Sequence, residues 1–147
     1  MKNILLFISL LIFSQLSIKA QTNDSDLVRQ AGLNYIEGFY EGDTLKLKNG
    51  ISSELFKFGY WKGEDGNFGG DQMTYKQAID YSKGVLENER FVSSAAPKKV
   101  EIFDVQEHIA AIKITAWWGI DYALLSRKEG VWKIEQVLWQ GPIRTIK

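Results

Sequence analysis

The sequence predicts an α+β fold: a cone-shaped, curved antiparallel sheet packed on a long N-terminal helix and shorter helices. Two patterns carry this prediction. Apolar residues recur every three or four positions in the first half of the chain and about every second position after Pro97, which indicates helices first and strands afterwards. That order is typical of α+β proteins, and a bent sheet under few helices leaves a wide end where a ligand pocket forms.

The long N-terminal helix is predicted from about Asp26 to Glu41. Asp24, Ser25 and Asp26 are the candidates for its N-cap, because their side chains accept hydrogen bonds from the first backbone N–H groups. Gly42 ends the helix. One buried stripe is expected along it, formed by Val28, Ala31, Tyr35 and Phe39.

Two shorter helices are expected before the strands. One follows Asp43, and the other begins at Thr74, a residue type that caps helices well. The inward-facing residues of this last helix are expected to be Ala78, Tyr81, Val85 and Leu86. Between the two helices, "GEDGNFGG" (63–70) is typical of a turn-rich loop, and before it the residues Leu55, Lys57, Gly59 and Trp61 alternate with aromatic ones.

Four successive antiparallel strands are predicted after Pro97, over residues 98–106, 109–118, 120–128 and 131–139. The connections fall at Glu107-His108, at Gly119 and at Glu129-Gly130. A tight turn at Trp118 and Gly119 places Ala116 opposite Asp121. Asp121 then shares the apolar face of its strand and points into the cone, unless a bulge at Gly119 turns it outward.

Asp121 and Gln136 are the polar residues expected on the inner face. An ionised carboxylate buried without partners costs several kcal/mol, so Asp121 must be paired, protonated or hydrated. Two roles stay open for it: a pocket group, or a structural carboxylate that caps a turn or meets a nearby Arg or Lys. Gln136 interrupts the set Trp132, Ile134 and Leu138, so its amide either faces the pocket or bonds to the first helix.

Aromatic residues form 13% of the chain and include five tryptophans, whose flat rings suit a heteroaromatic ligand. Tyr35, Phe39, Trp61 and Trp117 are the candidates for the pocket wall, with Trp61 beside the glycine-rich loop. The alternative is structural. Aromatic residues at helical spacing usually belong to the core, and a tryptophan on the outer face of a sheet suits contact with a second subunit.

Residues 1–20 have the layout of a secretory signal peptide: Lys2, an apolar block at 4–13 and a small residue at Ala20. The block is too short for a membrane-spanning helix, which needs about 20 apolar residues. We therefore expect a secreted or periplasmic protein whose residues 21–147 form a single domain, with no membrane segment after cleavage.

Bulk composition argues against several classes of function. The 18 basic and 18 acidic residues balance, so the chain lacks the electrostatic footprint of a nucleic-acid-binding protein. With no cysteine and one histidine, neither a disulfide framework nor a transition-metal site is expected, and no cofactor is implied. The histidine, His108, is expected in a solvated turn between strands.

Several segments of the chain resemble a known family: "YIEGFYEGD" (35–43), "MTYKQAI" (73–79) and "DYALLSRKEGVWKI" (121–134) followed by "LW". They are similar to the putative lumazine-binding proteins, a branch of the nuclear transport factor two-like superfamily that also holds polyketide cyclases and ketosteroid isomerases. The likeness covers about Asp26 to Gln140. It implies a cystatin-like cone with a pocket inside, often paired as a homodimer through the outer face of the sheet.

The isomerase branch implies more specific roles. In that branch a tyrosine precedes the aspartate of a Gly-Asp pair by eight residues, and Tyr35 has the same spacing from Asp43. The branch also has a protonated aspartate on a strand, and the corresponding position in this chain is one residue away from Asp121. In that branch the two groups donate hydrogen bonds to a developing oxyanion. The carboxylate base of the branch falls on Gly59, so the proton acceptor of the reaction is missing.

Three hypotheses follow from the sequence. The first is a secreted, non-enzymatic domain that binds a small apolar or heteroaromatic molecule between Tyr35, Phe39, Trp61, Trp117, Asp121 and Gln136. The second is an isomerase or cyclase in which Tyr35 and Asp121 are the candidate catalytic residues and polarise a carbonyl oxygen. The third is a dimeric interaction module that uses the outer face of the sheet.

Overall fold

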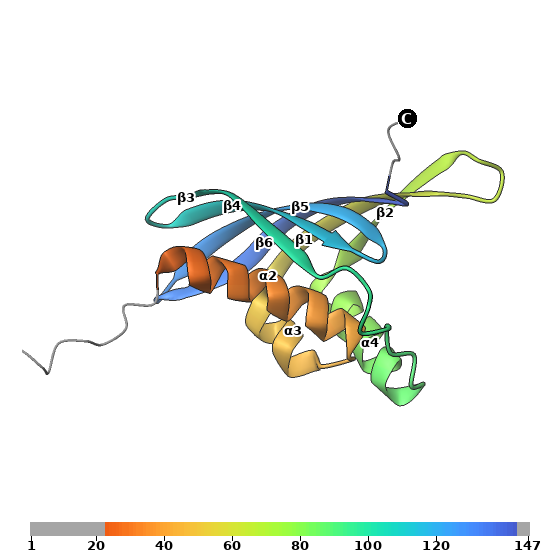
Figure 1. Cartoon of the computed structure of the whole chain (residues 1–147), viewed down its shortest axis with the longest axis horizontal. Helices are drawn as coiled ribbons and strands as arrows, with labels where there is room; N and C mark the ends of the chain where they lie inside the picture. Colours follow the sequence, from red (N-terminus) through yellow and green to blue (C-terminus); the bar gives the residue numbers. More distant parts are fainter. Residues whose placement is uncertain (1–22, 144–147) are drawn as a thin grey trace, which may run out of the picture.

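The structure is a computed structural model that describes residues 23–143, so the expected signal peptide at residues 1–20 lies outside the described part. Figure 1 shows a curved sheet with all the helices on its concave side. In chain order the elements are α2 (Asp24–Tyr40), α3 (Thr44–Gly50), β1 (Ile51–Lys62), β2 (Phe68–Thr74), α4 (Tyr75–Glu87), β3 (Lys99–Val105), β4 (Ile109–Ala116), β5 (Gly119–Lys128) and β6 (Val131–Gly141). The α+β fold class is confirmed.

The sheet has six strands in the order β2-β1-β6-β5-β4-β3, two more than the four that periodicity predicted. The additional strands are β1 and β2. β1 pairs with β6 in parallel, while the other neighbours are antiparallel. β2 begins inside the glycine-rich segment that reads as a loop, because its residues are stabilised by pairing with β1 rather than by apolar side chains of their own.

Helix α2 begins two residues earlier than predicted. Its N-cap is Asn23, whose side chain accepts a hydrogen bond from the backbone N–H of Ser25, and not one of the three residues that follow Asn23. The predicted stripe is confirmed, because all four of its residues are buried. After the helix, Gly42 has φ +68°, a conformation that favours glycine, and a Cβ there would collide with the backbone of Leu86.

Both shorter helices have a side-chain N-cap, and Thr74 is the cap that was predicted for α4. Asp43 accepts hydrogen bonds from the backbone N–H groups of Leu45 and Lys46 at 2.9 Å each. Thr74 and Gln77 form a reciprocal capping box at the start of α4. The inward placement of Leu86 is wrong: Ser82 lies on the buried stripe with Ala78 and Val85 instead, and Leu86 is exposed. Tyr81 is 41% exposed, although its ring meets Phe39 edge to face.

The turn between β4 and β5 lies at Trp117 and Trp118, one residue earlier than predicted. Ile114 therefore lies opposite Asp121, where Ala116 was expected. This difference of two residues in register keeps each side chain on its predicted face, because side chains of a strand alternate with period two. Asp121 points inward and is fully buried.

A bulge in β6 changes the face of Gln136. Leu125 pairs with Ile134 and Leu124 pairs with Gln136, so Glu135 is an extra residue on β6. The bulge reverses the alternation that follows it. Val137 is therefore buried and Gln136 is exposed on the outer face, so the inward placement of Gln136 predicted from parity is wrong.

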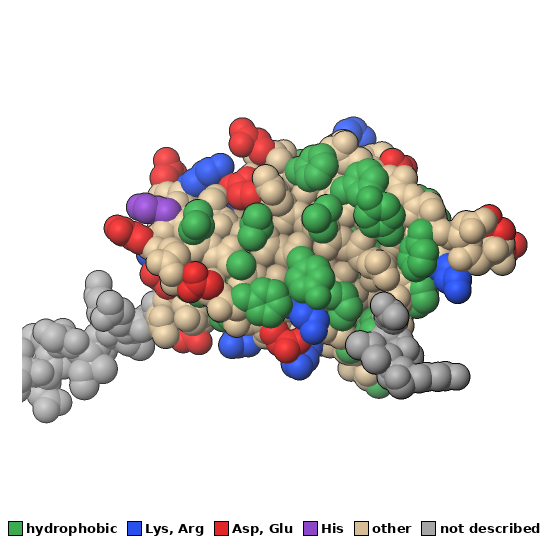
Figure 2. All heavy atoms as spheres, turned by 90° about the horizontal axis from the view of Figure 1, so that it is seen from above, with side chains coloured by type: hydrophobic (Ala, Val, Ile, Leu, Met, Phe, Trp, Pro, Cys, Tyr) green, Lys and Arg blue, Asp and Glu red, His purple; other side chains and the backbone are tan. Residues whose placement is uncertain are grey.

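The outer face of the sheet is strongly apolar. Figure 2 views this face and shows hydrophobic side chains distributed across the middle of the sheet. The exposed apolar residues include Tyr60, Phe103, Tyr122, Leu124 and Leu138. His108 is exposed at the β3–β4 turn, as expected. Within residues 23–143, no helix has the length and apolar character needed to cross a membrane.

Candidate small-molecule-binding site

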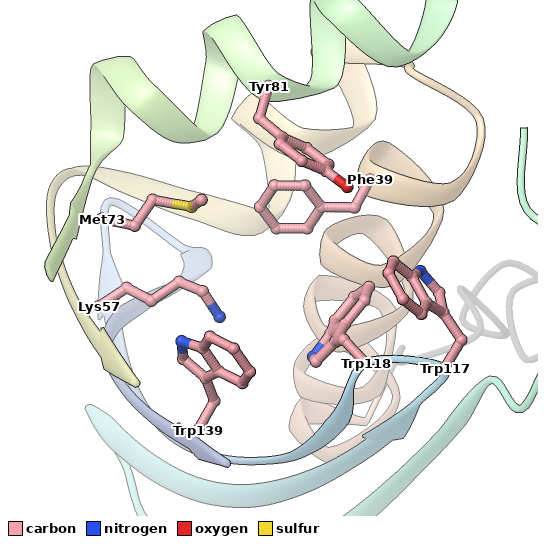
Figure 3. Close-up of a pocket in the computed structure, with 7 residues that line it drawn as sticks. All are labelled: Phe39, Lys57, Met73, Tyr81, Trp117, Trp118 and Trp139. Atoms are coloured by element: carbon pink, nitrogen blue, oxygen red, sulfur yellow. The ribbon is translucent and has the colours of Figure 1, made fainter. Parts of the chain in front are cut away.

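A cavity of about 190 Å³ lies on the concave side of the sheet, at the end covered by α4. Its wall is formed by Phe39, Lys57, Met73, Tyr81, Trp117, Trp118 and Trp139. Figure 3 shows the Lys57 amine directed into this group, with the rings of Trp118 and Trp139 on either side of it. The volume is somewhat larger than that of an apolar cavity of about 150 Å³ that binds benzene.

Five structural elements and one turn contribute to the wall. Phe39 comes from α2, Lys57 from β1, Met73 from β2, Tyr81 from α4 and Trp139 from β6. The two remaining tryptophans form the β4–β5 turn, and the backbone N–H of Trp117 donates to the Tyr40 hydroxyl at 2.7 Å. That hydroxyl in turn donates to the carbonyl of Pro97, so the turn is fastened to α2.

Lys57 belongs to a buried hydrogen-bond network behind the cavity. Its Nζ donates to the Tyr35 Oη at 2.6 Å, and the Tyr35 hydroxyl donates to Asp121 Oδ2 at 2.6 Å. Trp118 Nε1 donates to Asp121 Oδ1 at 2.8 Å, while Lys57 Nζ lies at 3.5 Å from Asp121 Oδ2. Lys57 is 5% exposed, and Tyr35 and Asp121 are fully buried. The carboxylate thus has two donors besides the lysine.

Burial sets the electrostatics of this network. It lowers the pKa of the Lys57 amine, and the nearby Asp121 charge opposes that shift. Burial also raises the pKa of Tyr35 well above its usual value of 10.0, together with the charge of Asp121 and the hydrogen bond to it. The Lys57 Nζ lies 5.2 Å from the ring centroid of Trp139 and 5.3 Å from that of Tyr35, distances at which an ammonium is attracted to an aromatic face.

The indole of Trp139 lies directly against the backbone of Gly59. A Cβ at Gly59 would overlap the indole ring, so glycine is required for this close approach. Gly59 is also the position onto which the isomerase resemblance places a carboxylate base. An indole occupies the space where a side chain at that position would begin.

The structure brings some of the predicted site residues together and separates others. Phe39 and Trp117 line the cavity. Tyr35 and Asp121 lie behind Lys57 and are not part of the wall. Trp61 is 43% exposed and lies outside the wall, as does Gln136 on the outer face.

Sequence reasoning did not assign five residues of the wall to the site: Lys57, Met73, Tyr81, Trp118 and Trp139. Lys57 gave a usable signal, because it is a charged residue at an inward position between Leu55 and Gly59. Tyr81 was expected to face inward, although not to line a cavity. Nothing in the local sequence marks Met73, because its place depends on the pairing of β2 with β1.

Comparison with solved structures defines the class of fold. A nuclear transport factor two-like protein of unknown function from Methylobacillus flagellatus KT has 18% sequence identity and a TM-score of 0.62, and the match covers 84% of this chain and 96% of that one. A similar protein from Shewanella oneidensis MR-1 has 15% identity and a TM-score of 0.58, with 81% and 100% covered. At these identities the likeness establishes the fold alone. The fold is nuclear transport factor two-like.

The particular family follows from the sequence. The chain belongs to the family described as putative lumazine-binding, whose profile matches residues 23–140. The resemblance stated from the sequence motifs is thereby confirmed. No protein with a curated description matches the chain.

Proposed function

We propose that this chain is a secreted domain that binds a small, flat apolar or heteroaromatic molecule in the cavity and catalyses no reaction. One observation carries the proposal: a cavity walled by aromatic side chains contains a single buried amine. A lysine ammonium has three donor hydrogens. One makes the short bond to Tyr35, and a second is directed at Asp121 Oδ2, 3.5 Å from Nζ. The amine therefore has one donor left for an acceptor atom on a ligand.

The shape of the wall supports a flat ligand. The ring of Trp118 meets both Phe39 and Trp117 edge to face, so the rings leave an angular, apolar space. Met73 lies on the helix side of that space (Figure 3), and a thioether side chain adapts to differently shaped ligands. The family description agrees with binding of a molecule such as lumazine, a bicyclic ring with carbonyl acceptors.

Tryptophan fluorescence tests this proposal, with lumazine and naphthalene as probes. We expect saturable quenching by both, because three tryptophans line the cavity. Lys57→Met is expected to weaken lumazine binding by about tenfold or more, the loss of one charged hydrogen bond, and to leave naphthalene binding almost unchanged. Lys76→Met, at an exposed position on α4, is the matched control. Absence of quenching by both probes at high micromolar concentration contradicts the proposal.

Secretion is the second element of the proposal and rests on residues 1–20, where the sequence has the layout of a signal peptide. We expect the mature protein to begin just after Ala20 when the full chain is expressed in a secreting host. N-terminal sequencing of the exported protein checks this. An unprocessed N-terminus in the cytoplasmic fraction contradicts it.

The isomerase alternative ranks below binding for a geometric reason. It needs Tyr35 and Asp121 to donate hydrogen bonds to a substrate oxygen, but the Tyr35 proton is donated to Asp121 and neither residue lines the cavity. The position of the base is Gly59. We expect no turnover of a β,γ-unsaturated ketone, and turnover that Tyr35→Phe abolishes would restore this alternative.

The partner that best fits the outer face of the sheet is a second copy of the chain, which would form a homodimer. Its apolar side chains lie side by side on β3, β5 and β6 and line a shallow groove. Exposed apolar patches of this kind are typical of association surfaces.

A further inference from the structure

We propose that Lys57 is a covalent capture site, whose amine condenses with the carbonyl group of a small aromatic aldehyde or ketone held in the cavity and forms a Schiff base. This inference rests on the proposed function, because the carbonyl compound must first bind in the same cavity. It goes further by making the bond to the ligand covalent and reversible.

The position of Lys57 meets the geometric requirement for capture. Among residues 23–143, it is the one lysine that is buried, and it is also part of the cavity wall. Its amine points into the space between Trp118 and Trp139 (Figure 3). An aromatic carbonyl compound seated against these rings has its carbonyl carbon within reach of Nζ.

The hydrogen-bond network supplies a way to remove the ammonium proton without sending it to solvent. Nζ lies 2.6 Å from Tyr35 Oη, and that hydroxyl lies 2.6 Å from Asp121 Oδ2. When Lys57 gives a proton to Tyr35, Tyr35 gives its own to Asp121. An ammonium and a carboxylate become an amine and a carboxylic acid, and no proton leaves the three groups.

The condensation then needs no proton donor or acceptor other than Lys57, Tyr35 and Asp121. Rotation about the Cε–Nζ bond turns the nitrogen lone pair into the cavity, where it attacks the carbonyl carbon. The carbonyl electron pair moves to oxygen, which takes the proton released by nitrogen, and a carbinolamine results. The proton stored on Asp121 returns through Tyr35 to the new hydroxyl group. Water leaves as the C=N bond forms, and the protonated Schiff base lies beside a carboxylate again.

The cavity selects the chemical class of the carbonyl compound. Its volume of about 190 Å³ and its aromatic wall suit a single substituted ring or a small fused ring system. Apart from Lys57, the wall residues contribute mainly apolar surface, so a sugar or another polyhydroxylated carbonyl compound would lose hydrogen bonds to water on binding. Benzaldehyde is the smallest probe that meets these requirements.

The test treats the full chain with benzaldehyde and sodium cyanoborohydride near neutral pH and maps the benzylated lysines by mass spectrometry. We expect Lys57 to be labelled at least about tenfold faster than the exposed Lys76, because the cavity holds the carbonyl group of the bound aldehyde next to the Lys57 amine. Labelling of Lys57 should saturate with benzaldehyde and be suppressed by benzyl alcohol, which has the same ring without the carbonyl. The comparison within one protein needs no variant, so loss of folding cannot imitate it.

Tyr35→Phe tests the role of Tyr35 as a positioning residue that relays the proton. We expect slower labelling of Lys57 and a labelling rate that rises only at higher pH, while benzyl alcohol still binds. A purely structural role for Tyr35 would change the amount of folded protein without moving the pH profile of labelling.

The outcomes separate the two proposals. If benzyl alcohol occupies the cavity but Lys57 is labelled no faster than Lys76, covalent capture is overturned and ligand binding stands. Labelling of Lys57 that benzyl alcohol does not suppress also overturns capture in the cavity. If neither lumazine nor benzyl alcohol binds and Lys57 is not labelled, both proposals fail.

Discussion

At the scale of single residues, the main feature is a charged network inside an apolar core. Asp121 accepts hydrogen bonds from Tyr35 and Trp118 and lies near the Lys57 amine. Buried pairs of this kind contribute little net stability compared with apolar residues of similar volume, but removal of one partner alone is costly because the other charge stays buried. The network is therefore a site of strong coupling between residues.

A double-mutant cycle measures this coupling. Asp121→Asn leaves the Lys57 ammonium without its counter-ion, and we expect it to destabilise the fold by about 3–5 kcal/mol. Lys57→Met combined with Asp121→Asn removes both charges and is expected to recover a large part of that loss. Urea unfolding of the four proteins gives the free energies. Additivity of the two single changes within about 0.5 kcal/mol would mean that the residues are not coupled.

Glu37 makes a pH-dependent contribution to the stability of the fold, and a single substitution can measure it. Lys46 donates to its carboxylate at 2.8 Å and Lys98 lies at 3.3 Å. The hydrogen bond from Lys46 is the main cause that holds the pKa of Glu37 below its usual value of 4.5, and burial opposes the shift. Because the folded-state pKa lies below the unfolded one, the stabilisation is present above pH 4.5 and is lost as the pH falls through the folded value.

Glu37→Gln should therefore destabilise the fold near neutral pH and make little difference in acid. The pair is partly exposed, so we expect a loss of about 0.5–1 kcal/mol. Urea unfolding of both proteins at several pH values below neutrality checks the trend. Glu87→Gln, at an exposed pair with Lys83 on α4, is the control. A difference between wild type and Glu37→Gln that grows as the pH falls would contradict the assignment.

At the scale of elements, the pairing of β1 with β6 shapes the cavity. Gly59 lies opposite Trp139 in this parallel pair, and the indole lies over the glycine backbone. The contact holds Trp139 beside the Lys57 amine, at 5.2 Å from Nζ to the ring centroid. A glycine on one strand thus positions a wall residue on the next.

Gly59→Ala should displace the indole of Trp139. Added bulk in a packed region costs about 1–3 kcal/mol, so we expect a lower Tm and weaker binding of lumazine. Thermal unfolding and tryptophan fluorescence measure the two effects. Gly69→Ala on β2 is the control, because its Cβ would make only ordinary contact with Trp61. Unchanged stability and binding in Gly59→Ala would show that the indole moves without cost.

The elements also differ in how well periodicity predicts them. The apolar stripe of α2 and the alternation of buried and exposed residues in β4 and β5 are clear in the sequence, because each of these elements packs one face on the core. Residues of β2 are mostly exposed, so hydrophobic alternation is absent and its strand depends on hydrogen bonds to β1. The bulge at Glu135 leaves no clear mark in the sequence, and it moved Gln136 to the outer face.

At the scale of the whole molecule, the two faces of the sheet differ in character. The concave face holds the cavity and the charged network, and the outer face carries exposed apolar side chains (Figure 2). Leu138 is 58% exposed and lines the groove on the outer face. Contact with a second copy of the chain would remove this apolar surface from water.

We expect the protein to be a homodimer by light scattering, and Leu138→Lys to be monomeric. A buried lysine at the centre of an apolar interface must lose its hydration, which disfavours association. Leu45→Lys is the matched control, since Leu45 is 70% exposed on α3, away from the outer face. A monomeric wild type, or a Leu138→Lys variant that stays dimeric, contradicts association through this face.

The sequence by itself determined the α+β class, the buried stripe of α2, the Thr74 cap of α4 and the family, and it favoured the inward direction of Asp121. These features depend on local spacing, since each follows from a helical or strand period or from residues close together in the chain. Only the tertiary structure decided that Lys57 is the partner of Tyr35 and Asp121, and that Trp139 and Met73 complete the cavity wall. Lys57 and Asp121 are 64 residues apart, and such a contact depends on strand order and on the bulge in β6, which no local pattern specifies.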